Sequence, residues 1–479
     1  METILKIFED KNAVRSAVVA VAALTVILSI NWTPLKHIPG PTGWNLKFRI
    51  QQLVAATRGK RHELIQNVVD QHGSICKIRN VVVVSDADLV KRILTDSEEF
   101  IRAADVRIIE GIFDNALFVL PTGETWKRHR KLIQPGFGPT HIRHTAHVTL
   151  ETMDKMRSIW DQRLKSTDSI QCNIRYNLSA VTLEVIGLVA FGNSFNAVEK
   201  VEKDSEWRWT AFDAGVNIMK KRFLFAEFLW PLFGLDKNSS NLTKLNQNLK
   251  DEVQQGISKK NTEEDQDSTN NNWKLNVKQR LMGSGEQGLL SEEEIDGELI
   301  GFFLAGLGTT TNTLTFTMLE LCRHPDVCEK LYNEIKDVKF DNFNYVEVLS
   351  SLKVNTIFGG LIRTATKDVY LGDYLIPQGT QVFANIRAVH LNPKYWTDPL
   401  TFNPDRWLEK IYPNSFLPFG DGNHNCIGQK VAVIEAKMIL FQLVKHYSFS
   451  IVEGFPLDFV TILSYTLKDG LMINLSKRK

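Results

Sequence analysis

The stretch that decides the fold is Phe416–Lys430, which reads FLPFGDGNHNCIGQK. Its single cysteine, Cys426, lies among three glycines and shortly before a good helical stretch, Gln429–Lys445. Glycines let a backbone adopt positive φ or pass close to a flat cofactor. The helix that follows directs its amides and its positive end toward the sulfur, which favours a thiolate.

A thiolate held in this way can ligate iron, or it can act as a nucleophile with the neighbouring His424 as its base. The third interpretation is a buried cysteine in a glycine-rich turn, and residue chemistry alone leaves all three open. The other cysteines are scattered, and an odd total of 5 argues against a disulfide framework and for a reducing compartment. A zinc site is disfavoured because no second ligand pair stands at a suitable spacing. These four free thiols are Cys76, Cys172, Cys322 and Cys328.

The run Phe419-x-x-Gly422-x-His424-x-Cys426-x-Gly428 resembles the cysteine-loop signature of the cytochrome P-450 family. The resemblance implies a haem cofactor with Cys426 as the axial iron ligand, and Phe419, His424 and Gly428 as haem neighbours. One departure is His424, which stands where the family usually has an arginine that donates to a haem propionate. Histidine still donates a hydrogen bond, but it lacks the permanent charge and the fork geometry of a guanidinium.

Three further stretches resemble the same family, in the family's order. Trp126 and Arg130 resemble the WxxxR helix, whose tryptophan and arginine contact the propionates, and their i, i+4 spacing places them on one helix face. Arg363 falls where a family arginine, just before a strand, reaches a propionate. Phe402–Trp407 resembles the aromatic-Pro-Arg stretch ahead of the cysteine loop.

A long apolar helix is predicted from about Glu292 to Cys322, opened by a capping box at Ser291–Glu294. His324-Pro325 closes this helix, and a second helix follows through Ile335. The resemblance implies the cytochrome P-450 fold, with the long helix above the haem and the cysteine loop on the proximal side.

Within this helix Ala305–Thr310 reads AGLGTT, and each glycine weakens a helix by about 1 kcal/mol relative to alanine. Similar family segments kink beside the iron, so the resemblance makes Gly306, Thr309 and Thr310 the catalytic candidates, with Thr309 delivering protons. A glycine-lined packing contact between helices is the alternative. Gly308 replaces the acid usual in the family and removes one relay carboxylate, which keeps an oxygen-independent isomerase or dehydratase open.

The family pattern breaks between Leu352 and Arg363, which read LKVNTIFGGLIR without a Glu-x-x-Arg motif. About three helical turns are absent between Phe358 and Arg363. In the family that pair braces the arginine that corresponds to Arg406, and an uncompensated buried charge costs about 3–5 kcal/mol. Either the deletion is real, which favours an inactive or weakly active haem- or lipophile-binding protein, or the sequence has lost an exon edge.

The N-terminal region contains an uncharged apolar run, Ser16–Ile30. It is shorter than the roughly 20 residues that cross a bilayer, but it can extend if Arg15 snorkels. A cleaved signal peptide is the competing interpretation, although no clear cleavage site follows. Basic residues downstream favour a cytoplasmic body. We therefore expect a membrane anchor over residues 1–37, most plausibly in the endoplasmic reticulum, and a catalytic domain over 38–479.

Composition and periodicity place the chain among mainly α proteins with a small β portion. The net charge of +2 gives no indication of a nucleic-acid partner. Strands are expected at Val81–Val84, Tyr370–Ile376 and Gln381–Ala384, with helical periodicity over 86–332. The polar run Lys259–Asn272 is expected to be a solvated loop.

Partners follow mainly from the resemblance, which implies a monooxygenase that uses O2 and electrons from an NADPH-cytochrome reductase of the membrane. Apolar residues in 108–118 and 223–230 favour a lipophilic small-molecule substrate, although such clusters are more often core. Lys127, Arg128 and Lys131 could offer a basic patch to an acidic electron donor, or simply form a solvated helix face.

Overall fold

The computed structural model describes residues 34–41, 45–103, 114–203, 218–219, 221–222, 230, 233–236, 239–257, 276–337, 353–461 and 464–478. The predicted anchor run and the polar 259–272 loop lie outside these residues, as do the apolar stretches 108–113 and 223–229. The described part is mostly helical and carries small sheets, as expected. Its α-helices are α3 (Leu46–Thr57), α4 (Arg61–His72), α5 (Ala87–Thr95), α6 (Glu124–Ile133), α7 (Pro139–Arg163), α8 (Ile174–Ile186), α9 (Ala197–Lys203), α11 (Ser240–Ile257), α12 (Val277–Glu286), α13 (Glu292–Arg323), α14 (Pro325–Ile335), α16 (Ile386–His390) and α17 (Gln429–His446).

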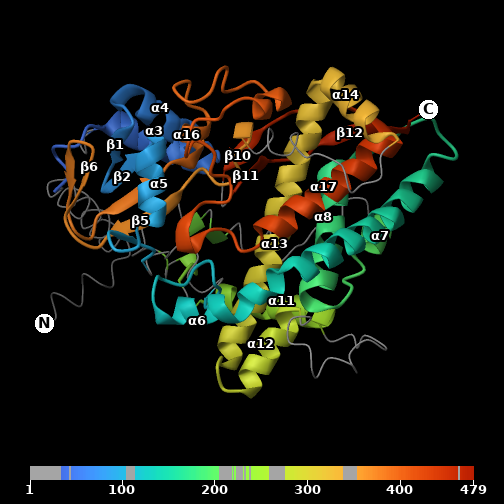
Figure 1. Ribbon diagram of the computed structural model, residues 1–479, viewed down its shortest axis with the longest axis horizontal. Helices are drawn as coiled ribbons and strands as arrows, with labels where there is room; N and C mark the ends of the chain where they lie inside the picture. Colours follow the sequence, from blue (N-terminus) through green and yellow to red (C-terminus); the bar gives the residue numbers. More distant parts are fainter. Residues whose placement is uncertain are drawn as a thin grey trace, which may run out of the picture.

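The strands β1, β2 and β5 lie at one end of the molecule together with α3, α4, α5 and α16, and the long helices α7, α8, α13 and α17 lie at the other end (Figure 1). The long helix α13 runs through the helical part and packs on α8, while α17 packs on α7. Four short helical segments complete this set: η2 (Gln134–Phe137), η3 (Gly187–Phe191), η9 (Pro404–Leu408) and η10 (Gly422–His424). A large apolar core joins α7, α8, α13 and α17, and a second core lies beneath the main sheet.

The main sheet has the strand order β1-β2-β8-β5-β3, in which β2 and β8 are parallel and the other pairs antiparallel. The expected strands are present, the stretch 370–376 as the β6–β7 hairpin. Two short strands interrupt the region predicted to be helical, because they pair with strands from the C-terminal third. The strands are β1 (Ile75–Ile78), β2 (Val81–Val84), β3 (Phe100–Ile101), β4 (Ile170–Asn173), β5 (Leu361–Ala365), β6 (Val369–Leu371), β7 (Tyr374–Ile376), β8 (Gln381–Ala384), β9 (Tyr447–Ile451), β10 (Phe459–Thr461), β11 (Tyr465–Leu467) and β12 (Met472–Lys477).

The predicted capping box opens α13. The Ser291 hydroxyl accepts a hydrogen bond from the Glu294 amide at 3.2 Å, and the Glu294 carboxylate accepts one from the Ser291 amide at 2.9 Å. Reciprocal bonding of this kind satisfies donors that a helix start would otherwise leave free. Among the described helices, α13 and the stretch Ile174–Phe191 are long and apolar enough to cross a membrane. Most of each is buried inside the molecule, which is what core helices show.

Candidate active site around Cys426

Glycines shape the loop that carries Cys426. Gly420 and Gly422 have φ of +69° and +68°, the left-handed region that side chains disfavour. A Cβ at Gly422 would stand 2.3 Å from the Leu94 carbonyl oxygen, so only glycine lets the loop lie against the end of α5. The loop closes when the Cys426 amide donates to the Phe419 carbonyl at 2.9 Å. The sequence-based expectation of a glycine-shaped turn is confirmed.

The environment of the Cys426 sulfur differs from the expectation drawn from the helix alone. Burial raises the pKa of the Cys426 thiol, while the Gly428 amide and the Arg130 charge lower it. The net direction is upward although Cys426 is an exposed residue of the loop, and the two lowering effects are those expected of a cysteine just before α17. A metal ion reverses this balance, because a coordinating thiol gives up its proton. A Cβ at Gly428 would lie 4.0 Å from this sulfur, which is ordinary van der Waals contact.

Two residues of α6 lie against the cysteine loop from one helix face, as their spacing predicted. The Trp126 ring lies 4.0 Å, centroid to centroid, from the His424 ring. Arg130 donates to the backbone and side-chain oxygens of Asn425 at 3.0 and 2.8 Å. Arg130 therefore holds the loop directly. Asn425, one residue before the cysteine, carries no motif signal and was missed from the sequence.

Three arginines surround His424. Burial lowers the pKa of His424 to about 3, and the charges of Arg102, Arg363 and Arg130 lower it further. The pKa of Arg102 falls to about 9 through burial and then through the other two arginines. Sequence reasoning missed Arg102, which follows β3. Because β3 pairs with β5 in the register Ile101 to Thr364, the next residues along are Arg102 and Arg363.

Arg363 and His424 each keep a buried nitrogen without a described hydrogen-bond partner. Arg363 is 3% exposed and sits inside β5 rather than just before it. Its Nη1 donates to the neighbouring Ile362 carbonyl at 2.9 Å, while Nη2 has no partner among the described residues. His424 binds Thr122 at 2.8 Å through Nε2, and its Nδ1 has no described partner.

This cluster matches a bound dianion. Buried donors are almost always satisfied, and no described carboxylate lies within ion-pair distance of the three arginines. The two propionates of a haem supply two negative charges with several acceptor oxygens, which is the missing chemistry. With the Cys426 sulfur beside the same cluster, the residues fit an iron porphyrin.

The AGLGTT segment lies on one unbroken helix, α13. The Thr309 hydroxyl donates to the Ala305 carbonyl at 2.8 Å, which is the backbone bond expected for a threonine in a glycine-weakened turn. A Cβ at Gly306 would stand 2.9 Å from Ile186 Cδ1, so this glycine also serves the close packing of α13 on α8. Thr310 is buried.

Arg406 is the arginine that a Glu-x-x-Arg pair would brace. Its guanidinium is buried, which lowers its pKa, while the charges of Glu409 and Asp398 raise it; no carboxylate of the described residues lies within ion-pair distance. It donates instead to three carbonyl oxygens, of Thr397 at 3.1 Å, Asp398 at 3.3 Å and Thr401 at 2.9 Å, while Nε stays unpaired. The sequence had suggested that the Arg406 charge is left uncompensated, but the three carbonyl oxygens partly compensate it. Carbonyl dipoles replace the carboxylate.

Lys353 is the second buried cation in this region, with no exposed surface. Its Nζ donates to the Pro399 carbonyl and stands 5.0 Å from the centre of the Trp396 ring. Burial, and then the charge of Arg406, lower the pKa of Lys353 from 10.5 to about 7. The lowered pKa of Lys353 favours its neutral form, which reduces the repulsion between Lys353 and Arg406.

The stability of the protein should accordingly rise with pH between about 7 and 10.5. Over that range folded Lys353 is neutral while the unfolded chain binds the proton, so the unfolded state holds more protons. Lys353→Met should remove this rise, as seen in urea unfolding at pH 6.5 and 8.5. The exposed Lys367→Met is the control. Parallel pH profiles for wild type and Lys353→Met would show that Lys353 stays charged when buried.

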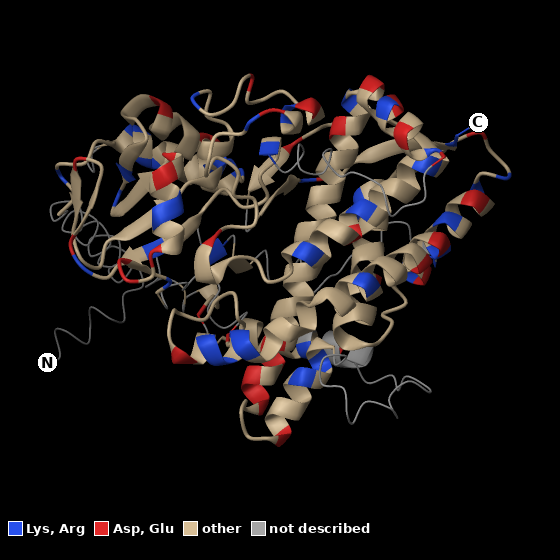
Figure 2. Cartoon of the chain, in the orientation of Figure 1, with Lys and Arg blue, Asp and Glu red and all other residues tan. Residues whose placement is uncertain are grey.

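The predicted basic patch lies on α6 (Figure 2). Lys127 pairs with Glu124 at 2.7 Å, and Arg128 pairs with Glu294 at the start of α13. Two of the three cations are therefore engaged within the protein, which favours the interpretation as a helix surface. A role in docking an electron donor stays a prediction.

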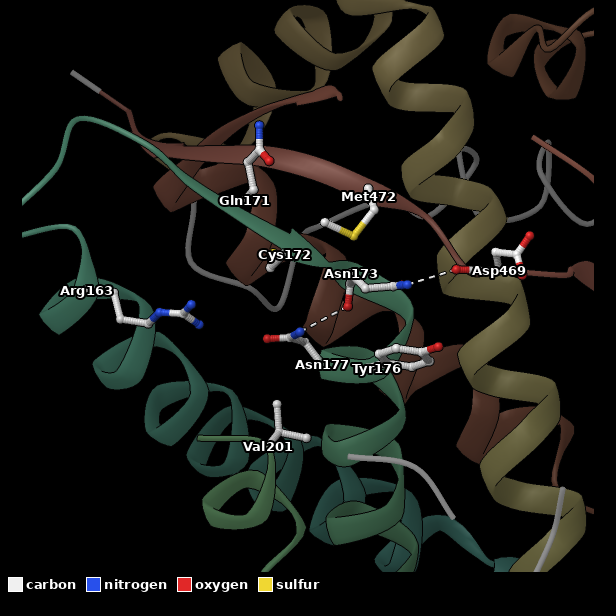
Figure 3. A pocket seen from close by; sticks show the side chains of 9 residues that line it. All are labelled: Arg163, Gln171, Cys172, Asn173, Tyr176, Asn177, Val201, Asp469 and Met472. Atoms are coloured by element: carbon white, nitrogen blue, oxygen red, sulfur yellow. Dashed lines mark hydrogen bonds between the residues drawn. The ribbon is translucent and has the colours of Figure 1, made fainter. Parts of the chain in front are cut away.

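A separate pocket of about 280 Å³ opens between the end of α7, β4 and β12 (Figure 3). Asn177 donates to the Asn173 carbonyl at 3.0 Å, and the Asn173 amide donates to the Asp469 carbonyl at 2.9 Å. The amides at this pocket thus bind the protein itself. None of the sequence-predicted site residues lines it.

Comparison with known proteins gives one consistent result. The family model for cytochrome P-450 matches residues 38–461. Cytochrome P-450 4c21 of Blattella germanica is 26% identical over 403 residues, which cover 78% of this chain and 79% of that protein. Cytochrome P-450 734A1 of Arabidopsis thaliana is 28% identical over 391 residues, or 77% of this chain and 73% of that protein. Cytochrome P-450 3A5 of Homo sapiens is 27% identical over 389 residues, with coverages of 77% and 76%. The chain belongs to the cytochrome P-450 family of haem monooxygenases, whose members bind haem iron through a cysteine thiolate.

Proposed function

We propose that the chain inserts one oxygen atom of O2 into a lipophilic small molecule, with electrons from an NADPH-dependent reductase. The observation that carries the proposal is the Cys426 loop beside buried nitrogens, on Arg363 and His424, that have no described partner. We further propose that residues 1–37 anchor the protein in the endoplasmic reticulum membrane, with the catalytic domain in the cytoplasm.

Different residues of the chain would bind the iron, bind the propionates and deliver protons. A bound haem-thiolate would supply the chemistry of dioxygen activation and oxygen-atom transfer, with the second oxygen atom leaving as water. Cys426 would hold the iron, and Arg102, Arg130 and Arg363 would hold the propionates. The Thr309 hydroxyl, which now donates to the Ala305 carbonyl, holds a transferable proton on the face of α13.

An apolar segment over α13 supports a lipophilic substrate. The Leu117 amide donates to the Glu298 carboxylate of α13 at 3.1 Å, which fixes this segment on the helix. A Cβ at Gly301 would lie 3.2 Å from Phe118 Cε1, and the Phe118 side chain stays 39% exposed. An exposed aromatic ring one turn before Ala305 offers an apolar contact to a bound molecule.

Two measurements test the proposal. Purified protein reduced under carbon monoxide should show the Soret band of thiolate-bound iron, and its absence would favour a non-catalytic haem- or lipophile-binding protein. NADPH consumption that needs both reductase and a candidate lipid should then accompany product formation. Conversion of a peroxide without NADPH or O2 would favour the isomerase or dehydratase instead.

Thr309→Ala should lower product formation by about 100-fold, near the lower end of what a positioned proton donor contributes. The haem spectrum should stay unchanged, since the substitution does not touch the cysteine loop. Thr313→Ala is the matched control, because the Thr313 hydroxyl makes the same bond to the Thr309 carbonyl, at 2.9 Å, one turn further along. Equal activity in the two variants would remove Thr309 from the proton pathway.

A further inference from the structure

The connection that replaces the missing helix, residues 353–360, is fixed by partners far away in the sequence. Asn355 and Thr356 are 5% and 2% exposed. The Asn355 amide donates to Glu320 of α13 at 2.8 Å, and the Ile357 carbonyl accepts from the Tyr465 amide of β11 at 2.7 Å. The connection is thus tied into the core rather than left as a loose loop.

A further contact, between Thr356 and His390, connects this segment to the cysteine loop. The Leu417 amide donates to His390 Nε2 at 2.9 Å. Because a backbone amide only donates, Nε2 must be the acceptor, and the ring proton sits on Nδ1. Nδ1 then donates to the Thr356 hydroxyl oxygen at 2.8 Å, and the hydroxyl donates onward to the Lys353 carbonyl at 3.4 Å. The bonds form one directed chain through fully buried side chains.

Leu417 lies at the base of the cysteine loop. Its carbonyl accepts from the Gly420 amide at 3.0 Å, and two residues further on the Phe419 carbonyl accepts from the Cys426 amide. The position of Leu417 therefore sets the first turn of the loop. His390 reaches the same segment a second way, since its ring lies 5.3 Å from the Phe416 ring.

Arg406 supports the other side of this segment. Its carbonyl contacts fix η9, and the next residue, Trp407, packs its ring 4.5 Å from the Phe416 ring. Phe416 is thus held between His390 and Trp407, directly before Leu417. Neither support uses a described carboxylate.

We propose that Thr356 and His390 are positioning residues that replace the missing Glu-x-x-Arg pair and hold the cysteine loop in the shape that binds iron. This inference rests on the proposed function, because the loop shape matters for chemistry only if Cys426 ligates haem iron. The role acts through the Leu417 amide rather than through contact with the haem.

The test is amide hydrogen exchange across residues 416–428 in the purified, haem-loaded full chain. Thr356→Val keeps the side-chain shape but removes the acceptor for Nδ1–H, and an unsatisfied buried donor should open the loop roughly tenfold more often. Exchange of the Leu417 amide should speed up by that factor, and Thr356→Ser should restore the wild-type rate. Thr145→Val, which removes a fully buried hydroxyl on α7, should leave it unchanged.

A merely structural threonine would lower stability without changing ligation in the protein that stays folded. The proposal instead expects Thr356→Val to lose part of the thiolate-type Soret band under carbon monoxide, with Thr356→Ser regaining it. Should Thr356→Val not fold, wild type alone decides the matter. Leu417 lies outside any helix or strand, so fast exchange of its amide in wild type would overturn the proposal.

The two ideas fail in different ways. A wild-type chain with a protected Leu417 amide but no thiolate band would contradict the proposed function, while the support of Leu417 by Thr356 and His390 would remain. A wild-type chain with the band, whose Leu417 exchange is the same in Thr356→Val, would sink the brace and leave the function standing.

Discussion

Replacing Cys426 with serine should abolish the thiolate-type Soret band completely and bring monooxygenase turnover below detection. A serine oxygen is a hard, weakly ionised ligand that cannot supply the electron density of a thiolate to iron. The loop itself should survive, because its shape depends on Gly420, Gly422 and the Cys426 backbone amide rather than on the sulfur. The measurements are the carbon monoxide difference spectrum and reductase-supported turnover.

Cys322→Ser is the control for this substitution, since Cys322 is a free and only partly buried thiol at the end of α13. It should keep the wild-type spectrum. If Cys426→Ser kept the same band as wild type, the iron ligand would have to be another residue, and the assignment of the cysteine loop would fall.

Arg363→Met should change apo and haem-loaded protein in opposite directions. Without haem, the variant removes a buried, unsatisfied donor and one of three neighbouring positive charges, which should raise the free energy of unfolding by about 1–3 kcal/mol. With haem, it removes a charged hydrogen bond to a propionate, worth about 1.5–3 kcal/mol, so affinity should fall about 10- to 100-fold. Urea unfolding of the apo-protein and haem transfer to a scavenger measure the two effects.

This prediction is specific because the substitution should stabilise the apo-protein and weaken haem binding. Arg92 lies on α5 and forms a partly exposed ion pair with Glu99. Arg92→Gln, which breaks this pair, should change the free energy of unfolding of both forms slightly and in the same direction. An Arg363→Met variant that is destabilised in both forms would show that the guanidinium braces the sheet instead of awaiting an anion.

Local patterns predicted the local structure well. The capping box at Ser291 and the proline at 325 set the ends of α13, and the β-branched run Val81–Val84 forms β2, because each signal acts over a few residues. The turn around Cys426 followed from its glycines for the same reason. A balance of opposing effects is harder to predict: desolvation raises the pKa of the Cys426 thiol, while the Gly428 amide and the Arg130 charge lower it.

Long-range partners could not be predicted from the chain. Arg102 joins the cationic cluster only through the β3–β5 register, and nothing around it in the sequence marks it. The missing Glu-x-x-Arg motif left the partners of Arg406 open. The carbonyls that take its place belong to residues 397–401, and a backbone oxygen carries no signal in an amino-acid sequence.

The connection formed by residues 353–360 also affects the order in which the protein folds. A helix can begin to form on its own, whereas the described part of this segment has five distant hydrogen-bond partners and one local side-chain hydrogen bond, from Thr356 to the Lys353 carbonyl. It can reach its native shape only after α13, α16 and β11 have assembled. Substitutions there should therefore accelerate unfolding while leaving the refolding rate nearly unchanged.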